Sequence, residues 1–145
     1  MMRLVVDTNV LVAELLRHRG RALIGDSRLL LCVTEQIIDE TKYELQQRIV
    51  RMISNGRLNE STGNELLDSG FDVLQTYLRV FKLETYEGLE TKARSRIPRD
   101  QNDWQTVALA LHLEAAIWTQ DYDFFGCGCA TWTTETLLLY LQSLG

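Results

Sequence analysis

Short, continuous apolar runs alternate along this chain with longer segments whose apolar residues recur at helical spacing. Residues 3–6 and 29–33 have the length and composition of buried strands, and residues 116–119 and 129–132 predict two shorter ones. Strands that alternate with helices are typical of α/β domains, whose helices cover both faces of a parallel sheet. The pattern therefore predicts one α/β domain over residues 1–145, with a central, mainly parallel sheet flanked by helices.

The expected helices are marked by their start and stop residues. Thr34 is a suitable N-cap for a long helix that Asn55-Gly56 ends, and Asn102 can cap a very apolar helix over residues 103–113. The remaining expectations are a helix after Asp7 that is broken at residues 18–21, helical structure over 59–81 with a break near Gly70, a polar loop with one helical turn over 84–99, and a final helix that begins at Thr133 or Thr134.

Acidic residues fall at particular points of this pattern. Asp7 follows the first strand, Asp121 follows the strand at 116–119, and Asp103 begins the most apolar helix. Because the carboxyl ends of parallel strands form the ligand crevice of such sheets, these acids should lie near one edge of one sheet. Each acid also has a simpler interpretation, as a helix cap, as an acid at the positive end of a helix, or as part of a turn. Their joint placement favours a functional site.

Grouped carboxylates indicate a particular chemistry. They repel one another and are costly to remove from water, so a fold tolerates them mainly where a cation neutralises them. Oxygen ligands without His or Cys favour hard cations, which makes Mg²⁺ or Mn²⁺ the expected metal. Because a metal-bound water of lowered pKa can attack phosphorus, the arrangement predicts a phosphodiester hydrolase.

Charge and basic residues modify this picture. The formal net charge of −5 argues against a nucleic-acid partner, but twelve of the fifteen basic residues are arginine, and bound metal would reverse the local charge. Arg94, Arg96 and Arg99 lead directly into the acidic helix, so they are candidates for holding substrate phosphates. The alternative is that they belong to a solvated charged loop.

Cysteine usage and the absence of long apolar runs bear on the cellular setting. Cys32, Cys127 and Cys129 do not have the number or spacing of a disulfide framework or a structural zinc site. We expect Cys32 in the core and the other two in a glycine-rich turn and the strand after it. No apolar run reaches the roughly 18–20 residues of a membrane span, and the start lacks signal-peptide features. The sequence thus predicts a cytoplasmic protein without a membrane segment.

Three segments resemble motifs of the PIN-domain family, the nucleases that include VapC-type toxins. Residues 5–11, Val-Val-Asp-Thr-Asn-Val-Leu, are similar to the family's opening motif. Residues 100–111 are similar to its central helix, with a leading acid and an alanine-rich body, and residues 117–124 to its Thr-x-Asp-x-Asp-Phe segment. Each motif is weak alone, but all three occur in the family's order and together they span nearly the whole chain.

The resemblance implies a set of functional residues. Glu40 matches a further family acid by position only, because the helical pattern does not single it out and Glu44 lies nearer to the apolar face. Asp100 is either an additional acid beside the cluster or, in the interpretation that we favour, a loop residue. The implied catalytic residues are Asp7, Glu40, Asp103 and Asp121; the implied metal ligands are Asp7, Asp103, Asp121 and Asp123; and the implied supporting residues are Thr8, Asn9 and Thr119.

The function implied by the resemblance is that of a Mg²⁺- or Mn²⁺-dependent endoribonuclease acting on single-stranded or loop RNA. Family members of this size often act as toxins paired with a small antitoxin protein and often form homodimers, so both partners are expected here. One alternative is a non-catalytic PIN-like module that binds RNA or protein through the same cleft. A metal-dependent phosphatase is a weaker alternative, because Asn9 stands where haloacid-dehalogenase-type enzymes have their second Asp.

Overall fold

The computed structural model describes residues 1–145, and its centre is a five-stranded sheet. The strand order is β3-β2-β1-β4-β5, and every neighbouring pair is parallel. The predicted α/β fold with a central sheet is therefore confirmed, and the sheet is entirely parallel. Its strands are β1 (Met2–Val6), β2 (Leu29–Thr34), β3 (Leu78–Phe81), β4 (Ala116–Trp118) and β5 (Thr131–Trp132).

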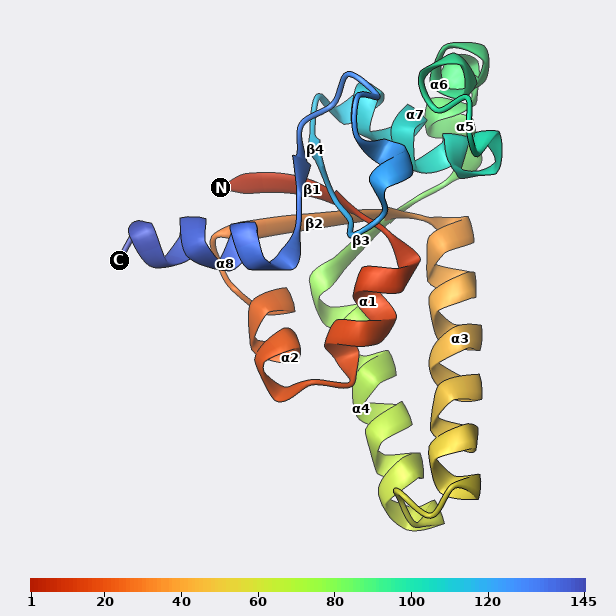
Figure 1. The fold of residues 1–145 in the computed structure, drawn as a ribbon, viewed down its shortest axis with the longest axis vertical. Coiled ribbons are helices and arrows are strands. Elements are labelled where there is room, and N and C mark those ends of the chain that lie inside the picture. Colours follow the sequence, from red (N-terminus) through yellow and green to blue (C-terminus); the bar gives the residue numbers. More distant parts are fainter.

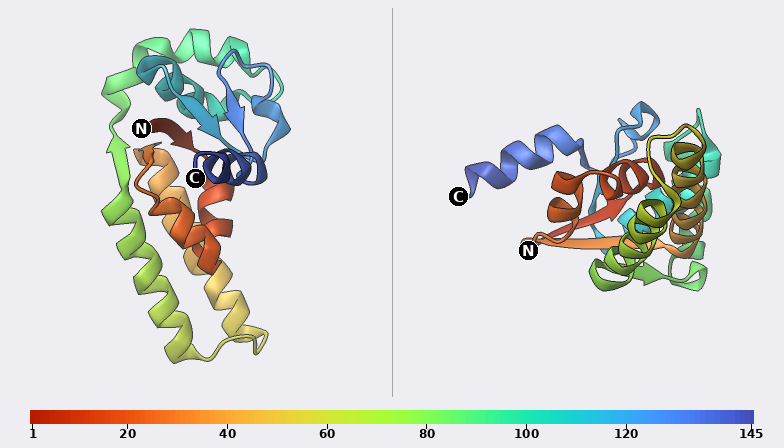
Figure 2. Two further views of the ribbon diagram at one scale, coloured as in Figure 1. Left: turned by 90° about the vertical axis from the view of Figure 1, so that its left-hand side faces the viewer. Right: turned by 90° about the horizontal axis from the view of Figure 1, so that it is seen from below.

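Helices cover both faces of this sheet (Figure 1). None of them has the length and apolar character that a membrane span requires. The layer on one face contains α1 (Thr8–Leu15), α2 (His18–Ile24), α3 (Glu35–Ser54), α4 (Glu60–Tyr77) and α8 (Thr134–Ser143). The layer on the other face contains α5 (Leu83–Tyr86), α6 (Glu90–Arg96) and α7 (Trp104–Leu113). The helices α3 and α4 form a long hairpin that projects away from the sheet (Figure 2).

The alternation of side chains along β1 divides the core into two parts. Successive side chains of a strand point to opposite faces, so Leu4 and Val6 pack under the first layer and Val5 under the second. The expectation that Cys32 belongs to the core is confirmed, and Trp104 and Trp118 are buried as well. Both parts of the core thus share one sheet, which holds the ends of its strands in fixed relative positions.

Several predicted elements were wrong. Residues 18–21 begin α2 instead of breaking a helix. The segment 84–99, expected to be a loop with one helical turn, contains most of the single-turn helix α5 and also the longer helix α6. Residues 78–81, expected to continue a helix, form the edge strand β3. An edge strand has a half-exposed, mixed pattern, and over four residues this pattern cannot be distinguished from the end of an amphipathic helix. The helix α7 begins one residue later than predicted, after a 3-10 turn over Gln101–Asp103.

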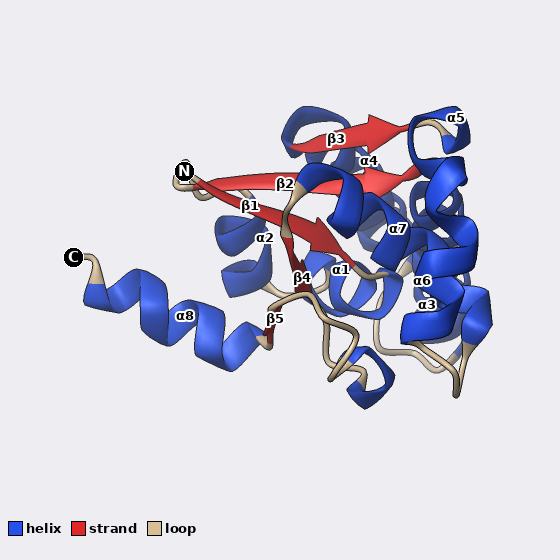
Figure 3. Cartoon of the chain, turned by 90° about the horizontal axis from the view of Figure 1, so that it is seen from above, coloured by secondary structure: helices blue, strands red, loops and turns tan.

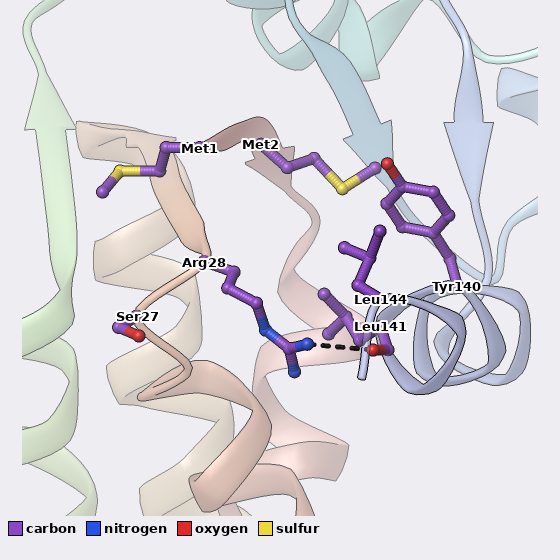
Figure 4. Close-up of a pocket in the computed structure, with 7 residues that line it drawn as sticks. All are labelled: Met1, Met2, Ser27, Arg28, Tyr140, Leu141 and Leu144. Atoms are coloured by element: carbon purple, nitrogen blue, oxygen red, sulfur yellow. Dashed lines mark hydrogen bonds between the residues drawn. The ribbon is translucent and has the colours of Figure 1, made fainter.

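The two ends of the sheet have different chemical character. The carboxyl ends of β1, β2 and β3 all point the same way, towards the side where α3 and α6 lie (Figure 3). At the amino end, a surface cavity of about 560 Å³ lies between α8 and the start of β1 (Figure 4). It is mainly apolar, and Arg28 reaches across it to donate a hydrogen bond to the Leu141 carbonyl at 2.9 Å. This larger cavity contains no carboxylate, so it offers no candidate catalytic group.

Candidate acidic active site

The strand order creates a crevice between β1 and β4. From β1 the chain proceeds to β2 and β3 on one side, and it then returns to place β4 on the other side of β1. Connections that leave two adjacent strands in opposite directions open a crevice beyond their carboxyl ends. Asp7 directly follows β1, and Asp121 lies three residues after the end of β4. The backbone N–H of Asp7 also donates to the Trp118 carbonyl at 3.2 Å, which ties the two strand ends together.

A pocket of about 220 Å³ occupies this position. The four acids predicted as catalytic all line it, although they come from four separate segments of the chain. Thr8 and Asn9, predicted as supporting residues, line it as well. The complete lining consists of Asp7, Thr8, Asn9, Glu40, Tyr43, Glu44, Asp103 and Asp121.

Two threonine hydroxyls hold carboxylates of the pocket in place. The fully buried Thr119 donates from Oγ1 to Asp7 Oδ2 at 3.1 Å, and the same oxygen accepts the backbone N–H of Asp121 at 3.0 Å. Thr8 donates from Oγ1 to Glu40 Oε2 at 3.1 Å, which joins the start of α1 to α3. Each hydroxyl therefore fixes one acid against a neighbouring element.

The carboxylates of the pocket perturb one another electrostatically. Burial raises the pKa of Asp7, and the charges of Asp121 and Glu40 raise it further, against the lowering effect of the Thr119 hydrogen bond. Burial is also the largest reason why the pKa of Asp103 is raised to about 7, followed by the charges of Asp100, Asp7 and Asp121. Carboxylic acids that are both buried and close to like charges resist ionisation. A bound cation would relieve this cost.

The donor set of the pocket fits a hard divalent cation. All of its acids offer oxygen, and neither His nor Cys lines it. No three acids stand where they could ligate one ion together. Mg²⁺ is, however, commonly held by one or two carboxylates while water fills its other positions. The arrangement therefore fits an ion bound through one or two side chains, with water between it and the remaining acids.

Asp100 and Asp123 lie beside this pocket without lining it. Asp100 accepts the backbone N–H of Asn102 at 3.2 Å, as a loop residue would, yet its charge also contributes to the raised pKa of Asp103. Both interpretations of Asp100 thus hold in part. Asp123 has its Oδ1 3.7 Å from Nε of Arg99.

Of the three arginines predicted to hold phosphate, two are engaged within the protein. Arg94 donates to Glu90 at 2.8 Å and stacks over the ring of Trp104, 5.4 Å from its centroid. Arg96 donates to the Cys127 carbonyl at 3.0 Å. The side chain of Arg99 is 77% exposed, and its only ion pair is the loose contact with Asp123. Arg99 is therefore the arginine best placed to meet a ligand.

Sequence reasoning missed two residues of the pocket. Tyr43 and Glu44 lie on α3 one turn beyond Glu40 and line the same pocket. Residues three and four apart share one face of a helix, so the spacing from Glu40 was a usable signal once that residue was a candidate. The predicted proximity of Glu44 to the apolar face agrees with its partial burial.

Comparisons with known proteins concern both the fold and the family of this chain. The crystal structure of PAE2754 from Pyrobaculum aerophilum is similar with a TM-score of 0.66 and 19% identity, over 98% of this chain and 90% of that one. FitAcB from Neisseria gonorrhoeae is similar with a TM-score of 0.56 and 20% identity, over 90% of this chain and 96% of that one. These likenesses concern the fold, and no curated protein matches the sequence. A family model described as PIN domain matches residues 5–142, and this chain therefore belongs to the PIN-domain family.

Proposed function

We propose that this protein is a Mg²⁺- or Mn²⁺-dependent endoribonuclease that hydrolyses phosphodiester bonds in single-stranded or loop RNA. One observation carries the proposal: Asp7, Glu40, Asp103 and Asp121 come from separate segments and line one small pocket at the crevice of the sheet. Membership of a family whose members are generally nucleases supports it.

The proposed roles follow from burial and hydrogen bonding. Asp7 is the only buried acid of the pocket, so it would bind the metal directly, with one of Asp103 and Asp121 as a second ligand and the other acting through bound water, while Thr119 orients the Asp7 carboxylate. Glu40, positioned by Thr8 at the exposed side of the pocket, would accept a proton from the attacking water. A bound divalent ion would supply an activated water and neutralise charge developing on the phosphate. Hydrolysis would leave a 5′-phosphate and a 3′-hydroxyl.

The substrate side of the proposal rests on Arg99 and Asn9. Both side chains are exposed, Asn9 lines the pocket, and Arg99 is free of strong internal contacts. Arg99 would hold a phosphate of the RNA beside the acids, with Asp123 keeping its guanidinium near the pocket. The contacts of Arg94 and Arg96 give these two residues structural roles, so a direct part in phosphate binding is not proposed for them.

Cleavage of a labelled panel of single-stranded RNAs tests this function. We expect cutting with Mn²⁺ or Mg²⁺, no cutting with EDTA, and at least a roughly 100-fold loss in the Asp7→Asn variant. The exposed Asp68 on α4 provides a matched control, because Asp68→Asn makes the same chemical change outside the pocket. Full activity of Asp7→Asn would remove Asp7 from the mechanism.

The alternative, a non-catalytic module that binds RNA or protein, has its own signature in the same experiment. It predicts that neither the unaltered protein nor the Asp7→Asn variant cuts RNA and that calorimetry detects no binding of Mn²⁺ to either. Retention of RNA by the metal-free protein would then support a non-catalytic binding module.

We further propose, from the family resemblance, that the protein is the toxin of a toxin–antitoxin pair and that it forms a homodimer. The antitoxin would be a small protein whose tail covers the acidic pocket, where a basic side chain could replace the cation. Expression should be toxic, and co-expression of the neighbouring gene should suppress the toxicity. Harmless expression of a nuclease-active protein would contradict the toxin role, and a monomeric mass in solution would contradict the dimer.

A further inference from the structure

The connection between β4 and β5 contains a pair of cysteines that the acidic pocket does not use. This connection carries Asp121 and Asp123 and ends in Cys127-Gly128-Cys129. Both cysteines are free thiols; Cys127 is buried, whereas Cys129 is partly exposed. Neither lies in the strand β5, so the expected turn is present but the strand begins only at Thr131.

The two thiols lie against one another. Sγ of Cys127 lies 3.9 Å from the Cys129 carbonyl oxygen, and each thiol shifts the pKa of the other. Gly128 makes this possible because its φ of +91° belongs to the left-handed region, which residues with a Cβ rarely adopt. The chain therefore folds back within a single residue and brings the side chains on either side of it together.

A positive charge from α6 covers this turn. The Arg96 guanidinium donates to the Cys127 carbonyl at 3.0 Å and lies so close to Gly128 that a Cβ there would collide with it. Interaction with the Cys129 thiol lowers the pKa of Cys127, and the charge of Arg96 adds to this lowering. The same interaction raises the pKa of Cys129, and burial raises it further. Thiolate, the reactive form of cysteine, is thereby stabilised at this turn.

We propose that Cys127 and Cys129 form a dithiol site that low-molecular-weight disulfides oxidise reversibly to an intramolecular disulfide. Cys129 is the more exposed of the two thiols, so it is the one that reacts, after it has transferred its proton to the Cys127 thiolate. The Cys129 sulfur attacks one sulfur of the small disulfide, whose S–S bond breaks and releases one thiolate.

The second step closes the ring. The released thiolate takes the proton from Cys127, and the Cys127 sulfur then attacks the sulfur of Cys129 and expels the second small thiolate, which is protonated by solvent. Two protein thiols and one small disulfide thus become one protein disulfide and two small thiols. An excess of small thiol reverses both steps.

Oxidation of the reduced, full-length protein with glutathione disulfide tests this proposal. After an acid quench and alkylation, mass spectrometry should show that the number of modifiable thiols falls from three to one, with Cys32 remaining free. Dithiothreitol should restore all three. The Cys32→Ser variant should behave in the same way, with two modifiable thiols falling to none. Cys127→Ser should stop at a mixed disulfide on Cys129.

Three results would overturn the proposal: persistence of three modifiable thiols, accumulation of a stable mixed disulfide in the unaltered protein, or a disulfide between two chains. The contribution of Arg96 is separable. Arg96→Met should slow oxidation at neutral pH roughly three- to tenfold by removing the charge, and Arg96→Lys should restore most of the rate. Equal oxidation rates in folded Arg96→Met and Arg96→Lys proteins would show that the positive charge at position 96 does not promote oxidation.

Discussion

At the scale of single residues, Thr119 links the two acids that follow adjacent strands. Its hydroxyl donates to the Asp7 carboxylate and accepts from the Asp121 backbone, so both of its hydrogen-bonding functions are used within a buried side chain. Replacing it with Val keeps the shape but leaves two polar partners unsatisfied. Thr119→Val should destabilise the protein by about 1–3 kcal/mol and reduce metal affinity or cleavage roughly 10- to 100-fold.

Urea unfolding, calorimetry and cleavage rates measure these effects separately. Thr119→Ser retains the hydroxyl and should keep most of the activity while losing some stability for the missing methyl group. If Val and Ser variants had equal activity, the hydroxyl would have no role in positioning Asp7.

Asp103 makes the stability of the metal-free protein depend on pH. Its pKa in the folded protein is about 7, above the ordinary value of 3.8, so between these values the folded chain binds a proton that the unfolded chain has released. Stability should therefore fall as pH rises from about 4 to about 7. Asp103→Asn should remove this loss and stabilise the metal-free protein at pH 8 by about 1 kcal/mol, a value reduced from the full linkage because the side chain is partly exposed.

Melting temperatures at pH 5 and pH 8, with EDTA, would show this difference. The stabilisation by Asp103→Asn should be large at pH 8 and should shrink at pH 5, where Asp103 is already protonated. Added Mn²⁺ should reverse the order at pH 8 by binding the ionised acid of the unaltered protein. A benefit of the variant that is equal at both pH values would contradict the raised pKa.

At the scale of elements, Gly70 explains why α4 continues where a break was expected. It lies buried in the middle of α4, and a Cβ there would stand 2.9 Å from Cδ2 of Leu45 on α3. The glycine thus permits close approach of two helices instead of ending one. Because α3 also carries Glu40 and Glu44, this contact helps to hold the wall of the acidic pocket.

Gly70→Val should therefore destabilise the protein by about 1–3 kcal/mol through overpacking against Leu45. Urea unfolding measures the change. Asp68→Ala, an exposed substitution on the same helix, should stay within about 0.5 kcal/mol of the unaltered protein. A Gly70→Val protein as stable as this control would show that the hairpin adapts to the extra volume.

At the scale of the whole molecule, one sheet belongs to both halves of the core. Trp118 lies in the part under α1–α4 and α8, and Trp104 in the part under α5–α7. Loss of either helical layer would expose one face of every strand, so neither half should persist without the other. We expect a single unfolding transition, with the same midpoint by tryptophan fluorescence and by far-ultraviolet circular dichroism. Separate midpoints would indicate that one layer melts first.

The position of the pocket is also a property of the whole molecule. The larger cavity lies at the amino ends of the strands and is mainly apolar, whereas the smaller pocket lies at the carboxyl ends and gathers the acids. Volume alone would have pointed to the amino end, whose cavity contains no carboxylate. The order of the strands, which places β4 beside β1, opens the crevice at the carboxyl ends where the acids meet.

Local sequence determined those features that depend on near neighbours. Buried runs identified β1, β2 and β4, the Thr34 cap located the start of α3, and the acids at strand ends indicated the candidate site. The family motifs added Glu40 and the supporting threonines.

Tertiary structure decided the rest. Whether residues 78–81 become a strand depends on pairing with β2, and whether Tyr43 and Glu44 reach the pocket depends on how α3 packs. The perturbed pKa of Asp103 and the contact of Arg96 with the cysteine turn arise between segments far apart in the sequence, so no local pattern could reveal them.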